Sequence, residues 1–107
     1  MAAEKDKQLI YREIKEYLAL LRDRNIPVHQ AYLFGSYANG RADEWSDIDL
    51  AIVTDKFVGD DFDFRFMLTK LARTIDADIE PHPYRISEFN ESNPFAGEIL
   101  KRGERVA

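Results

Sequence analysis

The most telling absence in this chain is cysteine, of which its 107 residues contain none. Disulfide bonds and thiolate metal sites are therefore excluded, and any metal ion must be held by oxygen or by histidine nitrogen. Long apolar runs are absent too, since no stretch approaches the roughly 20 residues of a membrane-spanning helix. The N-terminus, MAAEKDKQL, lacks the apolar core of a signal peptide. We therefore expect a cytoplasmic protein that does not bind a membrane.

An excess of positive charge is also absent. The sequence has 15 Lys and Arg against 20 Asp and Glu, which gives a net charge of −5. Proteins that grip nucleic acid unaided usually do so through a basic face, so this chain alone is not expected to bind nucleic acid stably. No linker, repeat or low-complexity tract is visible in the sequence. The length fits one domain over residues 1–107.

The pattern of apolar residues predicts a mixture of helices and strands. Helical spacing predicts helices over residues 4–24 and 62–75, and Pro94 begins a last helix that runs to about residue 101. Strands are expected at residues 28–34, 47–54, 77–80 and 104–106, the third being stopped by Pro81 and Pro83. The fold class is thus α+β, with a small mixed sheet of about four strands and helices packed mainly on one face.

The most informative stretch is residues 33–54, LFGSYANGRADEWSDIDLAIVT. Gly35 ends a predicted strand, and Ser36 can cap a short helix that Gly40 stops; such a turn can hold a phosphate. Asp47 and Asp49 open the next strand on one side of it, about 7 Å apart. Two carboxylates at this spacing repel by on the order of 2 kcal/mol, and a divalent cation reverses that field. Each half alone has an ordinary structural explanation, but together they indicate a metal–nucleotide site.

The spacing Gly35-Ser36, ten residues, Asp47-x-Asp49 resembles the signature of the DNA polymerase beta nucleotidyltransferase superfamily. The short chain is similar to the minimal nucleotidyltransferases of that superfamily. Its C-terminal half resembles one bacterial and archaeal branch in the segments IEPHPY (79–84), NPF (93–95) and EILKRG (98–103). The resemblance covers nearly the whole chain and implies a polymerase-beta-like nucleotidyltransferase core.

The resemblance also implies roles for individual residues. Asp47 and Asp49 would hold Mg²⁺ with the phosphates of an NTP, and a third carboxylate on a later strand would complete a two-metal site. Glu80 matches that branch best as the third carboxylate ligand, and Asp78 is the second candidate. The nucleotide would contact Gly35, Ser36, Asn39 and Arg41. Many relatives carry Arg at the position of Asn39, which leaves the catalytic efficiency of this chain open.

By the same resemblance the chain transfers an NMP group, with ATP as the expected donor, to a hydroxyl group. Relatives of this size are often paired with a small helical HEPN-domain toxin, and some act as antitoxins by adenylylating a toxin tyrosine. The alternative is a non-catalytic module that binds nucleotide or partner and neutralises the toxin by occlusion. A homo-oligomer is compatible with the sequence. A polymerase-like subunit is disfavoured by the negative charge.

A few other residues have two interpretations. For His82, which lies between two prolines, we favour a local structural role over contact with a metal or a phosphate. Trp45 could stack on a base or pack on its own loop. Phe62 and Phe66 could form an apolar patch for a partner, although packing of their helix is the favoured interpretation.

Overall fold

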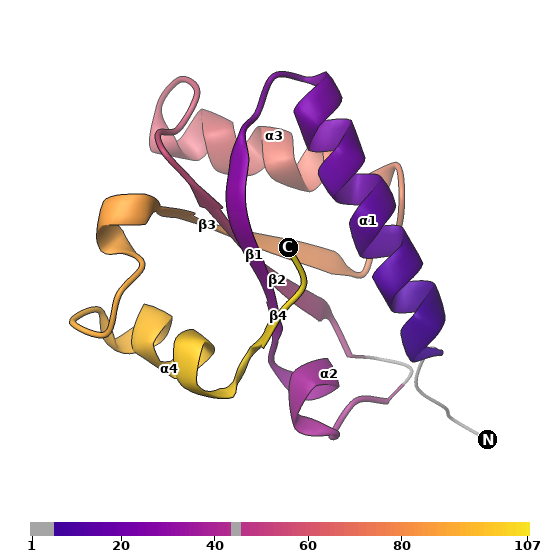
Figure 1. Ribbon diagram of the computed structural model, residues 1–107. Helices are drawn as coiled ribbons and strands as arrows, with labels where there is room; N and C mark the ends of the chain where they lie inside the picture. The colour runs from indigo at the N-terminus through magenta and orange to yellow at the C-terminus, as the bar shows by residue number, and fades with distance from the viewer. Residues whose placement is uncertain (1–5, 44–45) are drawn as a thin grey trace.

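The computed structural model describes residues 6–43 and 46–107, and its elements follow the order expected from the sequence (Figure 1). The helices are α1 (Lys7–Asp23), α2 (Ser36–Asn39), α3 (Asp61–Arg73) and α4 (Pro94–Arg102), with a 3-10 turn, η1 (Ile86–Glu88). The strands are β1 (Val28–Phe34), β2 (Ile48–Thr54), β3 (Ile79–Arg85) and β4 (Glu104–Arg105). Within the described residues, no helix combines the length and apolar character needed to cross a membrane. The alternative roles of Trp45 fall outside the described residues.

The four strands form one mixed sheet in the order β3-β2-β1-β4, which confirms the expected α+β class. β1 runs antiparallel to β2 and β4, whereas β2 and β3 run parallel. The register places Asp49 between Phe34 of β1 and Glu80 of β3. The end of β1 and the starts of β2 and β3 therefore meet at one place in the sheet.

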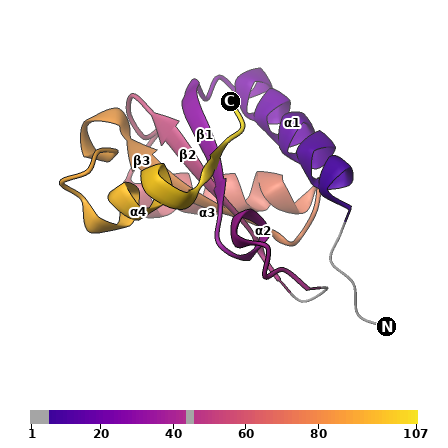
Figure 2. The ribbon, with the colours of Figure 1, turned by 60° about the horizontal axis from the view of Figure 1, so that its bottom comes forward.

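One face of the sheet packs against α1 and α3 and holds the larger core (Figures 1 and 2). Leu50 of β2 is fully buried there, as are Phe64 and Leu68, which lie one turn apart on α3. Tyr17 of α1 lies in the same core, and its hydroxyl donates to the carbonyl oxygen of Leu68 at 2.9 Å. Burial raises the pKa of Tyr17 beyond its usual range, so the hydroxyl stays protonated and keeps this bond.

The opposite face carries α4 over a smaller apolar cluster. Ala51 and Val53 of β2 pack there with Phe89 and with Ile99 of α4. Because side chains alternate along a strand, Asp49 lies on this same face, two residues before Ala51. The surface under α4 therefore changes from apolar to acidic toward the start of β2.

The start of α4 is fixed by local hydrogen bonds. The side-chain oxygen of Asn93 accepts the backbone N–H of Phe95 at 3.0 Å, and Pro94 occupies the first turn. Both features favour a helix that begins at this residue, since an Asn cap contributes about 0.5–2 kcal/mol and Pro lacks the N–H that the first turn leaves unpaired. The cap thereby sets where Phe95, which is 76% exposed, stands on the surface.

The third strand is longer than predicted. β3 runs through Pro81 and Pro83 to Arg85 and pairs with β2 along this whole length, so the expected stop at Pro81 is wrong. The reason is its position at the edge of the sheet, where one row of backbone N–H groups faces away from β2. Two prolines that are two residues apart share that row, so their missing N–H groups cost no ladder hydrogen bond.

Details at the start of β2 and of α2 also differ from the prediction. β2 begins at Ile48, so Asp47 precedes the strand instead of lying in it. Gly35, not Ser36, occupies the cap position of α2, where no side chain caps the helix. Gly40 does end this short helix in the left-handed conformation, as expected.

The aromatic residues of α3 divide between core and surface. Phe64 is buried and stacks on Phe57, with 4.7 Å between the ring centres. Phe62 and Phe66 are 75% and 60% exposed, and their rings lie parallel with centres 6.5 Å apart. Packing of these two residues into the core is therefore wrong, because a helix that turns Phe64 toward the sheet turns the positions two residues before and after it away.

Candidate active site

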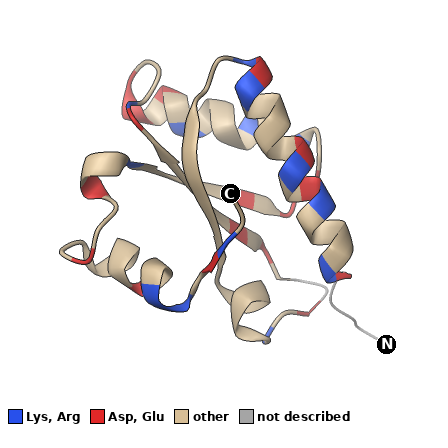
Figure 3. Cartoon of the chain, viewed as in Figure 1, with Lys and Arg blue, Asp and Glu red and all other residues tan. Residues whose placement is uncertain are grey.

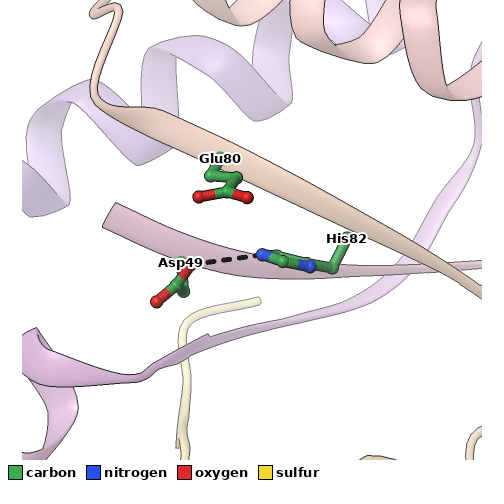
Figure 4. Close-up of side chains that lie close together, drawn as sticks. All are labelled: Asp49, Glu80 and His82. Carbon is green, nitrogen blue, oxygen red and sulfur yellow. Dashed lines mark hydrogen bonds and ion pairs between the residues drawn. The ribbon is translucent and has the colours of Figure 1, made fainter. Parts of the chain in front are cut away.

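Three side chains from the two parallel strands converge on the face that carries α4. Asp49 comes from β2, and Glu80 and His82 come from β3 (Figure 4). One ligand atom from each residue lies within 4.8 Å of the other two, a spacing compatible with a shared metal ion. Parallel pairing of Asp49 with Glu80, and the two-residue repeat of side chains along β3, explain the convergence.

The imidazole of His82 holds the carboxylate of Asp49. The Nε2 atom lies 3.2 Å from Oδ1, and both side chains are partly buried. Since an ionised carboxylate can only accept, the protonated Nε2 donates this hydrogen bond. The rings of His82 and Phe34 pack in a T-shaped arrangement, with centres 5.0 Å apart and planes at 63°. Two different contacts thus fix the ring beside Asp49.

The pKa of Glu80 responds to desolvation and to the neighbouring carboxylates. Its pKa is raised above the ordinary value, first by partial desolvation, then by a hydrogen bond with Asp47 and by the charges of Asp49 and Asp47. The neighbouring His82 acts in the opposite direction. A cation among these oxygens would relieve the repulsion, so the donor set fits a hard divalent ion such as Mg²⁺, with one imidazole nitrogen beside it.

The other two predicted carboxylates, Asp47 and Asp78, do not belong to this group of three. Asp47 is exposed, just before β2, and interacts with Glu80 without joining the three residues above. Asp78 precedes β3, and its carbonyl oxygen accepts the N–H of Ile48 at 2.7 Å. Within the described part of the chain, the structure brings Glu80, and not Asp78, into the group with Asp49.

Gly35 is needed for a reason that differs from the predicted one. Its φ and ψ are 75° and −149°, a region that is essentially restricted to glycine. A Cβ atom at this position would lie 2.2 Å from Oδ2 of Asp49. The absence of a side chain at Gly35 therefore makes room for the Asp49 carboxylate. This role is additional to the predicted one, in which the glycine lets the backbone approach a phosphate.

A cavity of about 880 Å³ opens beside this group, between the turn after β1, strand β3 and helix α4. Its walls include Gly35, Asn39, Arg41 and His82. Three of the four residues predicted to contact nucleotide thus line the same cavity as His82, which contacts Asp49. Ser36, the fourth, is half-buried at the start of α2.

His82 makes a contact that the sequence analysis did not predict, because its ring contacts Asp49 directly. The structural role favoured for His82 therefore includes holding a carboxylate of the candidate site. A usable signal was present, since His82 follows Glu80 by two residues and would share its face if the strand continued. The predicted stop at Pro81 hid that relation.

Comparison with known proteins agrees with this geometry. The sequence matches the family described as polymerase beta, nucleotidyltransferase over residues 12–107. Because the match covers most of the chain, the protein belongs to this family. Fold and family together identify it as a nucleotidyltransferase. No functionally curated protein matches the sequence.

Solved structures with the same fold give further context. A toxin–antitoxin crystallised with AMP-PNP is 27% identical, with a TM-score of 0.64 over 91% of this chain and 72% of that one. The toxin–antitoxin MntA–HepT is 25% identical, with a TM-score of 0.57 over 94% and 71% of the two chains. A candidate nucleotidyltransferase from Sulfolobus solfataricus, at 18% identity and a TM-score of 0.58 over 92% and 76%, supports the fold alone.

Proposed function

We propose that this nucleotidyltransferase uses Mg²⁺ to transfer an NMP group, with ATP as the donor, to a hydroxyl group on a partner protein. The observation that carries the proposal is the convergence of Asp49 with Glu80 and His82 beside Gly35. Two carboxylates and an imidazole beside a glycine turn that a phosphate can approach are the groups that a metal–nucleotide site requires.

In this proposal the carboxylates hold the cation, and the residues of the turn after β1 contact the nucleotide. Asp47, Asp49 and Glu80 would bind Mg²⁺, and Gly35, Ser36, Asn39 and Arg41 would contact the triphosphate. Mg²⁺, when bound, neutralises phosphate charge and stabilises the attacking and leaving oxygens. His82 acts as a positioning residue, because its hydrogen bond restricts the rotamer of Asp49.

The proposed transfer is a displacement at the α-phosphorus of ATP. The acceptor oxygen forms a bond to the α-phosphorus, the bond from that phosphorus to the oxygen bridging to the β-phosphate breaks, and pyrophosphate leaves. Glu80 accepts the proton of the acceptor hydroxyl. Its exposure leaves it reachable by a macromolecular acceptor.

A partner toxin is the acceptor that we favour. The similar solved structures include toxin–antitoxin proteins, one of them with AMP-PNP, and the present chain has a net charge of −5 that would attract a basic partner. By its resemblance to minimal nucleotidyltransferases, the partner is a small helical HEPN-domain protein and the transferred group is AMP. The chain would then act as an antitoxin.

The test combines the purified protein, ATP labelled at the α-phosphate, Mg²⁺ and the product of the neighbouring gene. We expect label on the partner, lost in Asp47→Ala and retained in Asp78→Ala. A stable complex with no transferred label would instead support the non-catalytic module. Asn39 favours this alternative, because many relatives carry Arg at its position. Retention of label by Asp47→Ala would remove this residue from the proposed metal site.

A further inference from the structure

The cavity beside Asp49, Glu80 and His82 extends well past the residues proposed to bind the phosphates. Beyond Gly35 and Arg41 it runs under α4, where its walls include Phe34, Tyr84 and Phe95. Its volume of about 880 Å³ lies within the range of about 300–1,000 Å³ that is common for small-molecule sites. Most of this space would stay empty if only a triphosphate were bound next to Gly35.

The lining combines aromatic rings with charged side chains, namely Arg41, Arg102 and Glu98. Phe95 stands at the first turn of α4 with 76% of its surface exposed, although its backbone is fixed by the Asn93 cap. Arg102 lines the other end of the same helix, where its guanidinium is paired with Glu98 at 2.5 Å. Figure 3 shows the basic residues gathered at that C-terminal end of α4. Aromatic faces bind nucleobases by stacking, and Arg41, at the Gly35 end of the cavity, favours an anionic group there.

The cavity opens directly beside the carboxylate proposed to hold the cation. His82, whose Nε2 lies 3.2 Å from Oδ1 of Asp49, lines the cavity, and so does Gly35, which lies against the other oxygen of Asp49. A nucleotide whose phosphates lie near Asp49 and Gly35 can therefore extend into the cavity with its base and sugar.

We infer that the space under α4 binds the nucleoside part of the NTP, with its base against the ring of Phe95. The inference rests on the proposed function and adds the location of the base and sugar, which the carboxylates and the glycine turn do not determine. The ligand is then held at two ends, by its phosphates near Asp49 and Gly35 and by its base near the start of α4.

The experiment compares AMP-PNP with inorganic tripolyphosphate, both with Mg²⁺, by titration calorimetry. Phe95→Ala should weaken AMP-PNP binding by about 5- to 100-fold, the usual effect of losing one base–aromatic contact, and leave tripolyphosphate binding unchanged. Phe95→Trp should keep AMP-PNP binding. Phe62→Ala is the matched control, because Phe62 is 75% exposed on α3, and it should change neither affinity.

Two results separate failure of this inference from failure of the proposed function. Equal AMP-PNP affinity in Phe95→Ala and wild type would overturn the inference, and loss of partner binding alone in that variant would assign Phe95 to the partner interface instead. Tripolyphosphate binding that Asp49→Asn abolishes would still support the proposed site in either case. If the wild-type protein bound neither ligand, the proposed function itself would fail.

Discussion

The two faces of the sheet differ in what their side chains do. The face under α1 and α3 is lined by fully buried residues such as Leu50 and Phe64. The face under α4 has a small apolar cluster and, at its end, the partly buried Asp49 beside His82. Neighbouring residues of β2 therefore serve opposite purposes, with Leu50 in the core and Asp49 in the candidate site.

This division explains how a chain of 107 residues can hold several acidic groups close together. Apolar burial stabilises a protein roughly in proportion to the area removed from water, and here most of it lies on the side away from the carboxylates. The cost of crowding Asp49 and Glu80 falls on a face that contributes less to folding. Stability and the site can consequently be perturbed separately.

The largest expected effect is on stability and comes from the core face. Phe64→Ala should lower the free energy of unfolding by about 3–5 kcal/mol, because Phe64 is fully buried and the cavity left behind is not refilled. Phe89→Ala, in the smaller cluster, should cost less, since its neighbours Tyr32 and Tyr84 are only partly buried. Urea unfolding of both variants measures the contrast, and equal losses would show that the two faces stabilise the fold alike.

The second largest effect is expected at Gly35, where a substitution should lower both stability and ligand binding. Gly35→Ala should cost about 1–3 kcal/mol of strain and also displace the Asp49 carboxylate, which a Cβ atom would meet at 2.2 Å. Gly40→Ala is the control, because Gly40 also has a positive φ, of 71°, but a Cβ there would meet no atom within 4 Å. Both variants should unfold more easily, yet only Gly35→Ala should lose Mg²⁺-dependent ATP binding. Normal binding by Gly35→Ala would refute the steric role of this glycine.

A smaller effect is expected at His82. His82→Ala should weaken binding of Mn²⁺, used as a spectroscopic substitute for Mg²⁺, by about 10-fold, since groups that orient metal ligands typically contribute 10- to 100-fold. His82→Gln should recover part of this affinity, because its amide can donate to Asp49 from a similar place. Paramagnetic resonance of Mn²⁺ gives both affinities. Unchanged affinity in His82→Ala would return this residue to a purely structural role.

The smallest effect is a pH-dependent change in stability at Glu80. Its pKa is raised in the folded protein, so the protonated form is favoured there, and its contribution to stability falls as pH rises above the ordinary Glu value of about 4.3. Glu80→Gln cannot ionise. The variant should therefore match wild type near pH 4 and melt slightly higher at pH 7, in low salt and without divalent metal.

Added Mg²⁺ should reverse that order, because the ion stabilises wild type and has lost a ligand in Glu80→Gln. Thermal melts with and without Mg²⁺ at both pH values provide the measurement. A wild type that melts higher than Glu80→Gln at pH 7 without metal would contradict the repulsion described above.

Much of the fold could be predicted because its signals are local. The apolar stripe of α3, the alternation in β2 and the proline that begins α4 each lie within one short segment. The extension of β3 through Pro81 and Pro83 could not be predicted in this way. It depends on the strand being at the edge of the sheet, which is a property of the whole fold.

The same distinction applies to the site. Asp49 and Glu80 could be predicted from spacing and from resemblance, and parallel pairing places them side by side. The contact of His82 with Asp49 and the crowding of Gly35 against the same carboxylate depend on register and on backbone angles that a linear pattern does not contain. Asp47 shows the converse, since a strong motif position lies just outside the strand that was expected to hold it.

The measurement that tests the central claim most directly is Mn²⁺ binding in the presence of ATP, followed by paramagnetic resonance, in wild type and in Asp49→Asn. The exchange keeps the shape of the side chain and removes its charge, and Asp78→Asn serves as the control. We predict that Asp49→Asn remains folded but binds the ion at least about 10-fold more weakly, and that Asp78→Asn binds it normally. Equal binding by wild type and Asp49→Asn would contradict the assignment of the α4 face as the metal–nucleotide site.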